Sequence, residues 1–183
     1  MRRSVSNVNL SPDARIVDVG CGTGEFAPLF RTKGYTGIDI DPSNIAYAKR
    51  HYPGYRFDIG DALALPFDDA SFDAALVVGV QHRLDRGLPP LAEIVGVVKP
   101  NAKALIMEDT ESTRLVTRTM HNLDQGAFIR SKAEWTSMME EFFTIGHLEK
   151  FFSPSRCESD SLTAMGHGRM ERASHGADGL FRC

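Results

Sequence analysis

Short apolar runs alternate with segments of helical period along most of this 183-residue chain, and this alternation constrains the fold more than any other feature. The runs have the length of strands, and each segment between them has room for a helix. Such alternation is typical of βαβ units, in which a helix connects two parallel strands. The predicted strands cover residues 15–19, 35–40, 55–59, 72–78, 102–107, 143–151 and 161–165.

Four helices are predicted between these strands. One follows the glycines at 20–24 and runs to about residue 32, and a second begins at Pro42 with Asp41 as its N-cap and ends near residue 51. The others cover residues 89–98 and 132–142. We expect a single α/β domain over residues 1–165, followed by a flexible tail at 166–183, where the chain is polar and rich in glycine.

Composition excludes several classes of protein. Hydrophobic residues make up 42% of the chain and charged residues 25%, which is ordinary for a globular domain. The net charge of −3 argues against a nucleic acid or an anionic membrane as the main partner. Neither a membrane span nor a secretory signal is recognisable, and three scattered cysteines predict no disulfide framework. We therefore expect a cytoplasmic protein.

Three features of the first 61 residues indicate a nucleotide-like ligand. The turn at residues 20–24 places glycines at alternate positions between a strand and a helix, where the backbone can approach a ligand closely. Asp39 ends the second predicted strand, at a spacing where an acidic side chain commonly binds ribose hydroxyls. Asp61 follows the third strand, where a carboxylate can accept a hydrogen bond from an adenine amino group.

Two classes of enzyme bind nucleotides in such a crevice. Nicotinamide-dependent oxidoreductases carry the pattern G-x-G-x-x-G, whose last glycine allows close packing of the helix on the strand. Here the pattern is G-x-G-x-G, and Phe26 follows Glu25 without that last glycine. An oxidoreductase therefore stays a weaker alternative.

Residues 17–24 resemble the first motif of the class I S-adenosylmethionine-dependent methyltransferases, of the small-molecule, type 11 kind. Residues 37–41, 60–67 and 71–84 are similar to its next three motifs, and residues 98–100 resemble the lead-in to its fifth strand. The resemblance implies a Rossmann-like, doubly wound and mostly parallel sheet. It would have seven strands, the last one antiparallel, with helices on both faces.

The resemblance also implies how S-adenosylmethionine would be held, with S-adenosylhomocysteine as the product. The backbone of Gly20 and Gly22 would contact the methionine part, with Cys21 as a small residue between them. Asp18 would hold the amino group, and the carbonyl of Val77 would accept from the same group.

The adenosine part would lie at the next two strands. Asp39 would bind the ribose hydroxyls, and Ile40 would pack on the face of the adenine. Asp61 and the N–H of Ala62 would read the adenine edge. The histidines show no metal-ligand spacing, so we expect no metal site.

The acceptor side is less determined by the sequence. His82 follows the fourth strand and is our candidate general base, although a packing role is the alternative; Arg83 stands where the family commonly has a second histidine. The segment 109–131 leaves the ligand end of the fifth strand, and we expect it to cover the substrate. The predicted acceptor is a small molecule, and the oligomeric state stays open.

A second alternative is a non-catalytic protein that keeps the methyltransferase fold. It stays open because Asn101 and Ala102 stand where relatives usually have two glycines. Asparagine tolerates the left-handed backbone conformation, whereas alanine does so less well.

Overall fold

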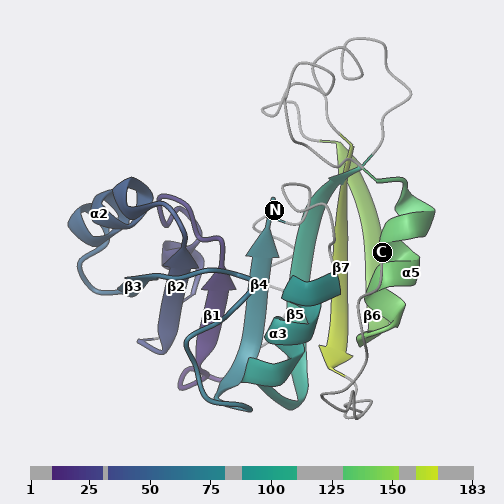
Figure 1. Ribbon diagram of the computed structural model, residues 1–183, viewed down its shortest axis with the longest axis horizontal. Helices are drawn as coiled ribbons and strands as arrows, with labels where there is room; N and C mark the ends of the chain where they lie inside the picture. The colour runs from purple at the N-terminus through teal and green to yellow at the C-terminus, as the bar shows by residue number, and fades with distance from the viewer. Residues whose placement is uncertain (1–9, 31–32, 81–87, 111–129, 153–159, 169–183) are drawn as a thin grey trace, which may run out of the picture.

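The molecule is built on a sheet with the strand order β3-β2-β1-β4-β5-β7-β6 (Figure 1). Strands β1 to β5 pair in parallel, whereas β7 runs antiparallel to both β5 and β6. The computed structural model describes residues 10–30, 33–80, 88–110, 130–152 and 160–168. The strands are β1 (Ile16–Val19), β2 (Tyr35–Asp39), β3 (Arg56–Ile59), β4 (Phe72–Val78), β5 (Val98–Thr110), β6 (Phe143–Phe152) and β7 (Asp160–Gly168).

The order of the strands reverses between β1 and β4. From β1 the chain moves outward through β2 to β3, and it then returns to place β4 on the other side of β1. Val19 pairs with Ile38 of β2 and with Val77 of β4, so the carboxyl ends of these three strands lie together. Open α/β sheets bind their ligands at such a reversal, beyond the carboxyl ends of the strands.

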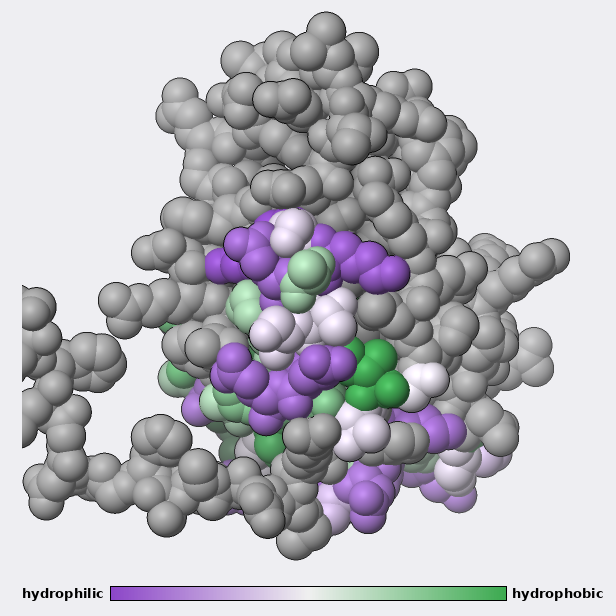
Figure 2. All heavy atoms as spheres, turned by 90° about the vertical axis from the view of Figure 1, so that its right-hand side faces the viewer, coloured by the Kyte–Doolittle hydropathy of each residue, from purple (hydrophilic) through white to green (hydrophobic). Residues whose placement is uncertain are grey.

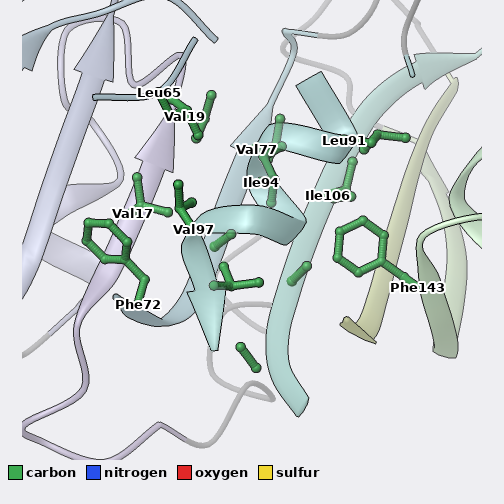
Figure 3. Packing of buried hydrophobic residues seen from close by; sticks show 14 of the residues in the cluster. Val17, Val19, Leu65, Phe72, Val77, Leu91, Ile94, Val97, Ile106 and Phe143 are labelled. Atoms are coloured by element: carbon green, nitrogen blue, oxygen red, sulfur yellow. The ribbon is translucent and has the colours of Figure 1, made fainter. Parts of the chain in front are cut away.

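Helices cover both faces of the sheet. Alternate strand residues, among them Val17, Val77 and Ile106, pack with Leu91 and Ile94 on one face (Figure 3). The residues between them form a second core with the helical segments of the other face. The helical elements are η1 (Ala27–Leu29), α2 (Pro42–His51), α3 (Leu88–Val97) and α5 (Lys132–Glu140). Within the described parts of the chain, no helix is long and apolar enough to span a membrane.

Two helices begin where their local sequence provides a cap. As predicted, α2 starts at Pro42, and Asp41 Oδ1 accepts a hydrogen bond from Ser43 N at 2.8 Å. Helix α5 has a capping box, in which Ser131 N donates to Glu134 Oε2 at 2.8 Å and Glu134 N donates to Ser131 Oγ at 3.3 Å. Trp135 of α5 is buried. The side of the molecule that carries α5 has many hydrophilic residues on its surface (Figure 2).

The parallel α/β fold predicted from the sequence is confirmed, and the strands lie close to their predicted positions. The prediction of a helix after the glycine turn is wrong within the described residues, since only the 3-10 turn η1 forms there. Pro28 lies inside this segment and has no N–H for a helical hydrogen bond.

The predicted fifth strand and the predicted tail have different limits in the structure. Strand β5 begins at Val98 rather than at residue 102, and Asn101 within it has a left-handed conformation, with φ of 61°. Strand β7 ends at Gly168, and the remainder of the expected tail, 169–183, lies outside the described residues.

Candidate cofactor site

The turn after β1 is fixed to β2 by its own backbone. Gly20 N and Cys21 N both donate to the carbonyl of Ile38, at 2.7 and 2.9 Å. Gly22 has a φ of 52°, a conformation that favours glycine, and a Cβ added there would meet no atom within 4 Å. The backbone at Gly22 is therefore open to a ligand.

Asp39 joins this turn to the start of α2. Its Oδ2 accepts a hydrogen bond from Gly22 N at 2.8 Å, and its Oδ1 accepts one from Asp41 N at 2.9 Å. Asn44 Nδ2 donates to the same Oδ1 at 3.3 Å. These bonds hold the carboxylate at the carboxyl end of β2, beside the open backbone of Gly22.

Asp18 lies fully buried near this turn. Its Oδ2 accepts a hydrogen bond from the hydroxyl of Tyr35 at 2.5 Å, whereas its Oδ1 has no partner within the described residues. Burial raises the pKa of this carboxyl from 3.8 to about 7, although the Tyr35 hydrogen bond acts in the opposite direction. A cationic group placed at Oδ1 would pair a carboxylate oxygen that is otherwise unsatisfied.

Cys21 is part of the turn and not a reactive thiol. Its side chain is buried, and burial together with the charges of Asp18 and Asp39 raises the pKa of the thiol well above its ordinary range. Because the thiolate is the reactive form, this thiol is held in its inert form. A Cβ added to Gly37 would lie 2.8 Å from Cys21 Sγ, so the sulfur fills the space that this glycine leaves.

Asp61, Ala62 and Ile40 lie together at the ends of β2 and β3. Gly60 N donates to the carbonyl of Asp39 at 3.1 Å, which places Asp61 and Ala62 beside the residue that follows Asp39. That residue, Ile40, is 69% exposed. The carboxylate of Asp61 caps its own turn by accepting from Leu63 N at 2.9 Å. An exposed apolar side chain can pack on the face of a planar base, and a polar turn beside it can form hydrogen bonds with the edge of that base.

Val77 and His82 are the remaining predicted residues. Val77 lies in β4 with its side chain buried in the core, so only its backbone can serve a ligand. His82 lies outside the described residues, as does most of the segment 109–131, so their predicted roles stay predictions.

Sequence reasoning missed Tyr35, Asn44 and Glu108. Tyr35 and Asn44 hold the carboxylates of Asp18 and Asp39, and Glu108 is a buried acid at the end of β5 that accepts a hydrogen bond from Val80 N at 2.8 Å. Only Glu108 carried a signal, because an acidic residue directly follows the apolar run at 104–107. The other two have contacts that no local pattern reveals.

The parallel sheet with a glycine turn at its reversal point defines a Rossmann-like α/β protein. Residues 17–106 match the family described as a methyltransferase domain. The chain is 39% identical over 104 residues to the phthiotriol/phenolphthiotriol dimycocerosates methyltransferase of Mycobacterium leprae, a match that covers 54% of this chain and 38% of the relative. It is 33% identical over 122 residues to the demethylmenaquinone methyltransferase of Renibacterium salmoninarum, with 66% of this chain and 52% of the relative covered.

A solved structure shows the same fold over nearly the whole chain. The S-adenosylmethionine-dependent methyltransferase of Methanosarcina mazei superposes with a TM-score of 0.78 at 20% identity, covering 91% of this chain and 98% of that one. The chain belongs to the class I S-adenosylmethionine-dependent methyltransferases, and the cofactor of that family is S-adenosylmethionine. It spans about two fifths to one half of the length of the two curated relatives.

Proposed function

We propose that this chain transfers the methyl group of S-adenosylmethionine to a small-molecule acceptor by in-line displacement. One observation carries the proposal, the hydrogen bond from Gly22 N to Asp39 Oδ2 at 2.8 Å. This bond joins the glycine turn after β1 to the acidic residue at the end of β2, next to the place where the strand order reverses. In this family geometry the methionine part and the ribose of the cofactor would be held side by side.

The methionine end would be held by β1 and β4. The unpartnered Oδ1 of Asp18 supports a role in holding the amino group, and the open backbone of Gly22 supports close approach of the ligand. The backbone of Gly20 would line the same side, and the carbonyl of Val77 would accept from the amino group.

The adenosine end would be held by β2 and β3. Asp39 would accept hydrogen bonds from the ribose hydroxyls, since its carboxylate is fixed beside the glycine turn by Gly22 N and Asp41 N. The exposure of Ile40 supports packing on the adenine face. Asp61 and the N–H of Ala62 would bind the adenine edge.

When bound, the cofactor supplies a methyl group activated by a sulfonium centre. The protein then has to place the acceptor in line and exclude water, because positioning supplies much of the rate acceleration. His82 would act as the general base where the acceptor must lose a proton. The names of the relatives, which include a demethylmenaquinone and phthiotriol dimycocerosates, support a small-molecule acceptor.

Two further features belong to the proposal. We assign the chain the family's complete seven-stranded sheet with an antiparallel last strand, which the pairing of β7 with β5 supports. We also assign it to the cytoplasm, on the basis of its three scattered cysteines.

Transfer of a labelled methyl group tests the activity. The protein would be incubated with S-adenosylmethionine labelled on the methyl and with a panel of quinones, fatty acids and hydroxylated lipids. We expect label in one acceptor class, and at least a tenfold lower rate for Asp39→Ala at low cofactor concentration, as roughly 1.4 kcal/mol of lost binding produces. Asp13→Ala is the matched control, because Asp13 is an exposed acid before the opposite end of β1. Full turnover by Asp39→Ala would contradict the proposal.

The segment 109–131 is proposed to cover the acceptor. Deletion of residues 122–130 should then lower methyl transfer while the affinity for S-adenosylhomocysteine is retained. Unchanged turnover on the labelled acceptor would show that the segment has no such role.

A further inference from the structure

Hydrogen bonds connect the first residues after β4 to the carboxyl-terminal part of β5, and Glu108 makes one of them. The residue is 3% exposed, and its Oε1 accepts a hydrogen bond from Val80 N at 2.8 Å. One residue earlier, Gly79 N donates to the carbonyl of Met107 at 2.9 Å. Two consecutive hydrogen bonds therefore fix the first residues after β4 at the carboxyl end of the sheet.

The side chain of Val80 lies directly on the glycine turn. A Cβ added to Gly20 would lie 2.1 Å from Val80 Cγ2, so the valine methyl occupies the space that a larger residue at 20 would need. Val80 is partly buried and packs against the core that includes Val77 and Ile106. The contacts thus run from Glu108 through Val80 to Gly20.

We propose that Glu108 is a positioning residue for the methionine end of the cofactor. It holds Val80 against Gly20 and so keeps the glycine turn in the shape that the methionine part requires. This inference rests on the proposed function, because it takes Gly20 and Gly22 as the backbone that this part approaches. The side chain acts through the hydrogen bond that its Oε1 accepts from Val80 N, because an acceptor is needed there to satisfy that N–H.

Two variants of Glu108 separate the hydrogen bond from the charge. Glu108→Gln keeps a carbonyl oxygen that can accept from Val80 N. Glu108→Leu has a similar size but leaves that N–H without an acceptor. Val80→Ala removes the contact with Gly20 by an independent change, and it carries the test if Glu108→Leu does not fold.

Two ligands report on different parts of the cofactor site. S-adenosylhomocysteine contains the amino-acid end, whereas 5′-methylthioadenosine keeps the adenosine and the thioether and lacks the ammonium and carboxylate. We expect Glu108→Leu and Val80→Ala to weaken binding of S-adenosylhomocysteine about tenfold, as loss of one buried hydrogen bond would, and that of 5′-methylthioadenosine less than about twofold. Glu108→Gln should stay within roughly threefold of the wild type for both ligands.

Calorimetry on the full chain gives the deciding comparison. An equal loss for both ligands would mean that Glu108 only stabilises the fold, and no loss for either would mean that it does not act on the site. Each of these results overturns the inference while leaving the proposed function intact, provided that wild type binds S-adenosylhomocysteine and that Asp39→Ala binds it at least about tenfold more weakly. A wild type that binds neither ligand would instead overturn the proposed function.

Discussion

At the scale of single residues, the buried carboxyl of Asp18 affects both the pH dependence of folding and the binding of a cationic group. Its carboxyl is fully buried, one oxygen has no partner within the described residues, and its pKa is raised to about 7 by burial. The folded protein therefore holds a proton here that the unfolded chain releases near its ordinary pKa of 3.8. The stabilising contribution is complete below pH 3.8 and is lost as the pH rises through 7.

Asp18→Asn should reveal this linkage. The amide imitates the protonated acid and can still accept from the hydroxyl of Tyr35, but it cannot ionise. We expect the variant to gain roughly 1–3 kcal/mol of unfolding free energy relative to wild type between pH 5 and pH 8. Urea unfolding at several pH values measures it, with Asp13→Asn as the control. If the free energy of unfolding of Asp18→Asn and that of wild type varied with pH in parallel, the account would be contradicted. The same variant should bind the cofactor more weakly.

At the scale of elements, local sequence determines both where α2 begins and why no full helix follows the glycine turn. The cap of α2 was predictable because Asp41 and Pro42 act on neighbouring backbone. The prediction of a helix after the glycine turn underestimated the effect of Pro28, which lacks an N–H, and within the described residues of this segment only the turn η1 forms.

The capping box of α5 gives a stability prediction for one element. Ser131→Ala removes the acceptor for Glu134 N and should lower the free energy of unfolding by about 1 kcal/mol. Trp135, the only tryptophan, is buried on the same helix and reports unfolding by its fluorescence. The control is Ser137→Ala, because Ser137 is exposed within α5 and caps nothing. Equal stability of Ser131→Ala and wild type would contradict the structural role of the box.

At the scale of the whole molecule, the sheet order explains how residues far apart in sequence form one site. Parallel pairing aligns the carboxyl ends of β1, β2 and β4, so Asp39 and the glycine turn that follows β1 lie at the same edge of the sheet. Alternating apolar runs predicted the parallel sheet, whereas the order of its strands comes from the structure. The apolar runs did not predict the contact of Tyr35 with Asp18 or that of Glu108 with Val80. These contacts join residues 17 and 28 positions apart in the sequence, so they depend on how the strands pair.

Ligand binding should stabilise this whole assembly. Because the site joins several strands, S-adenosylhomocysteine at about 100 times its dissociation constant should raise the melting temperature by roughly 5–10 °C. A thermal scan with and without ligand measures the shift, and NAD at the same concentration is the control for the oxidoreductase alternative. A shift with NAD and none with S-adenosylhomocysteine would favour that alternative.

The central claim is that the turn after β1 and Asp39 together hold S-adenosylmethionine, and isothermal calorimetry tests it most directly. The account predicts micromolar binding of S-adenosylmethionine and S-adenosylhomocysteine, about −8 kcal/mol, weakened at least about tenfold in Asp39→Ala and unchanged in Asp13→Ala. Folded wild-type protein that binds neither ligand, or an Asp39→Ala variant that binds both as tightly as wild type, would contradict it.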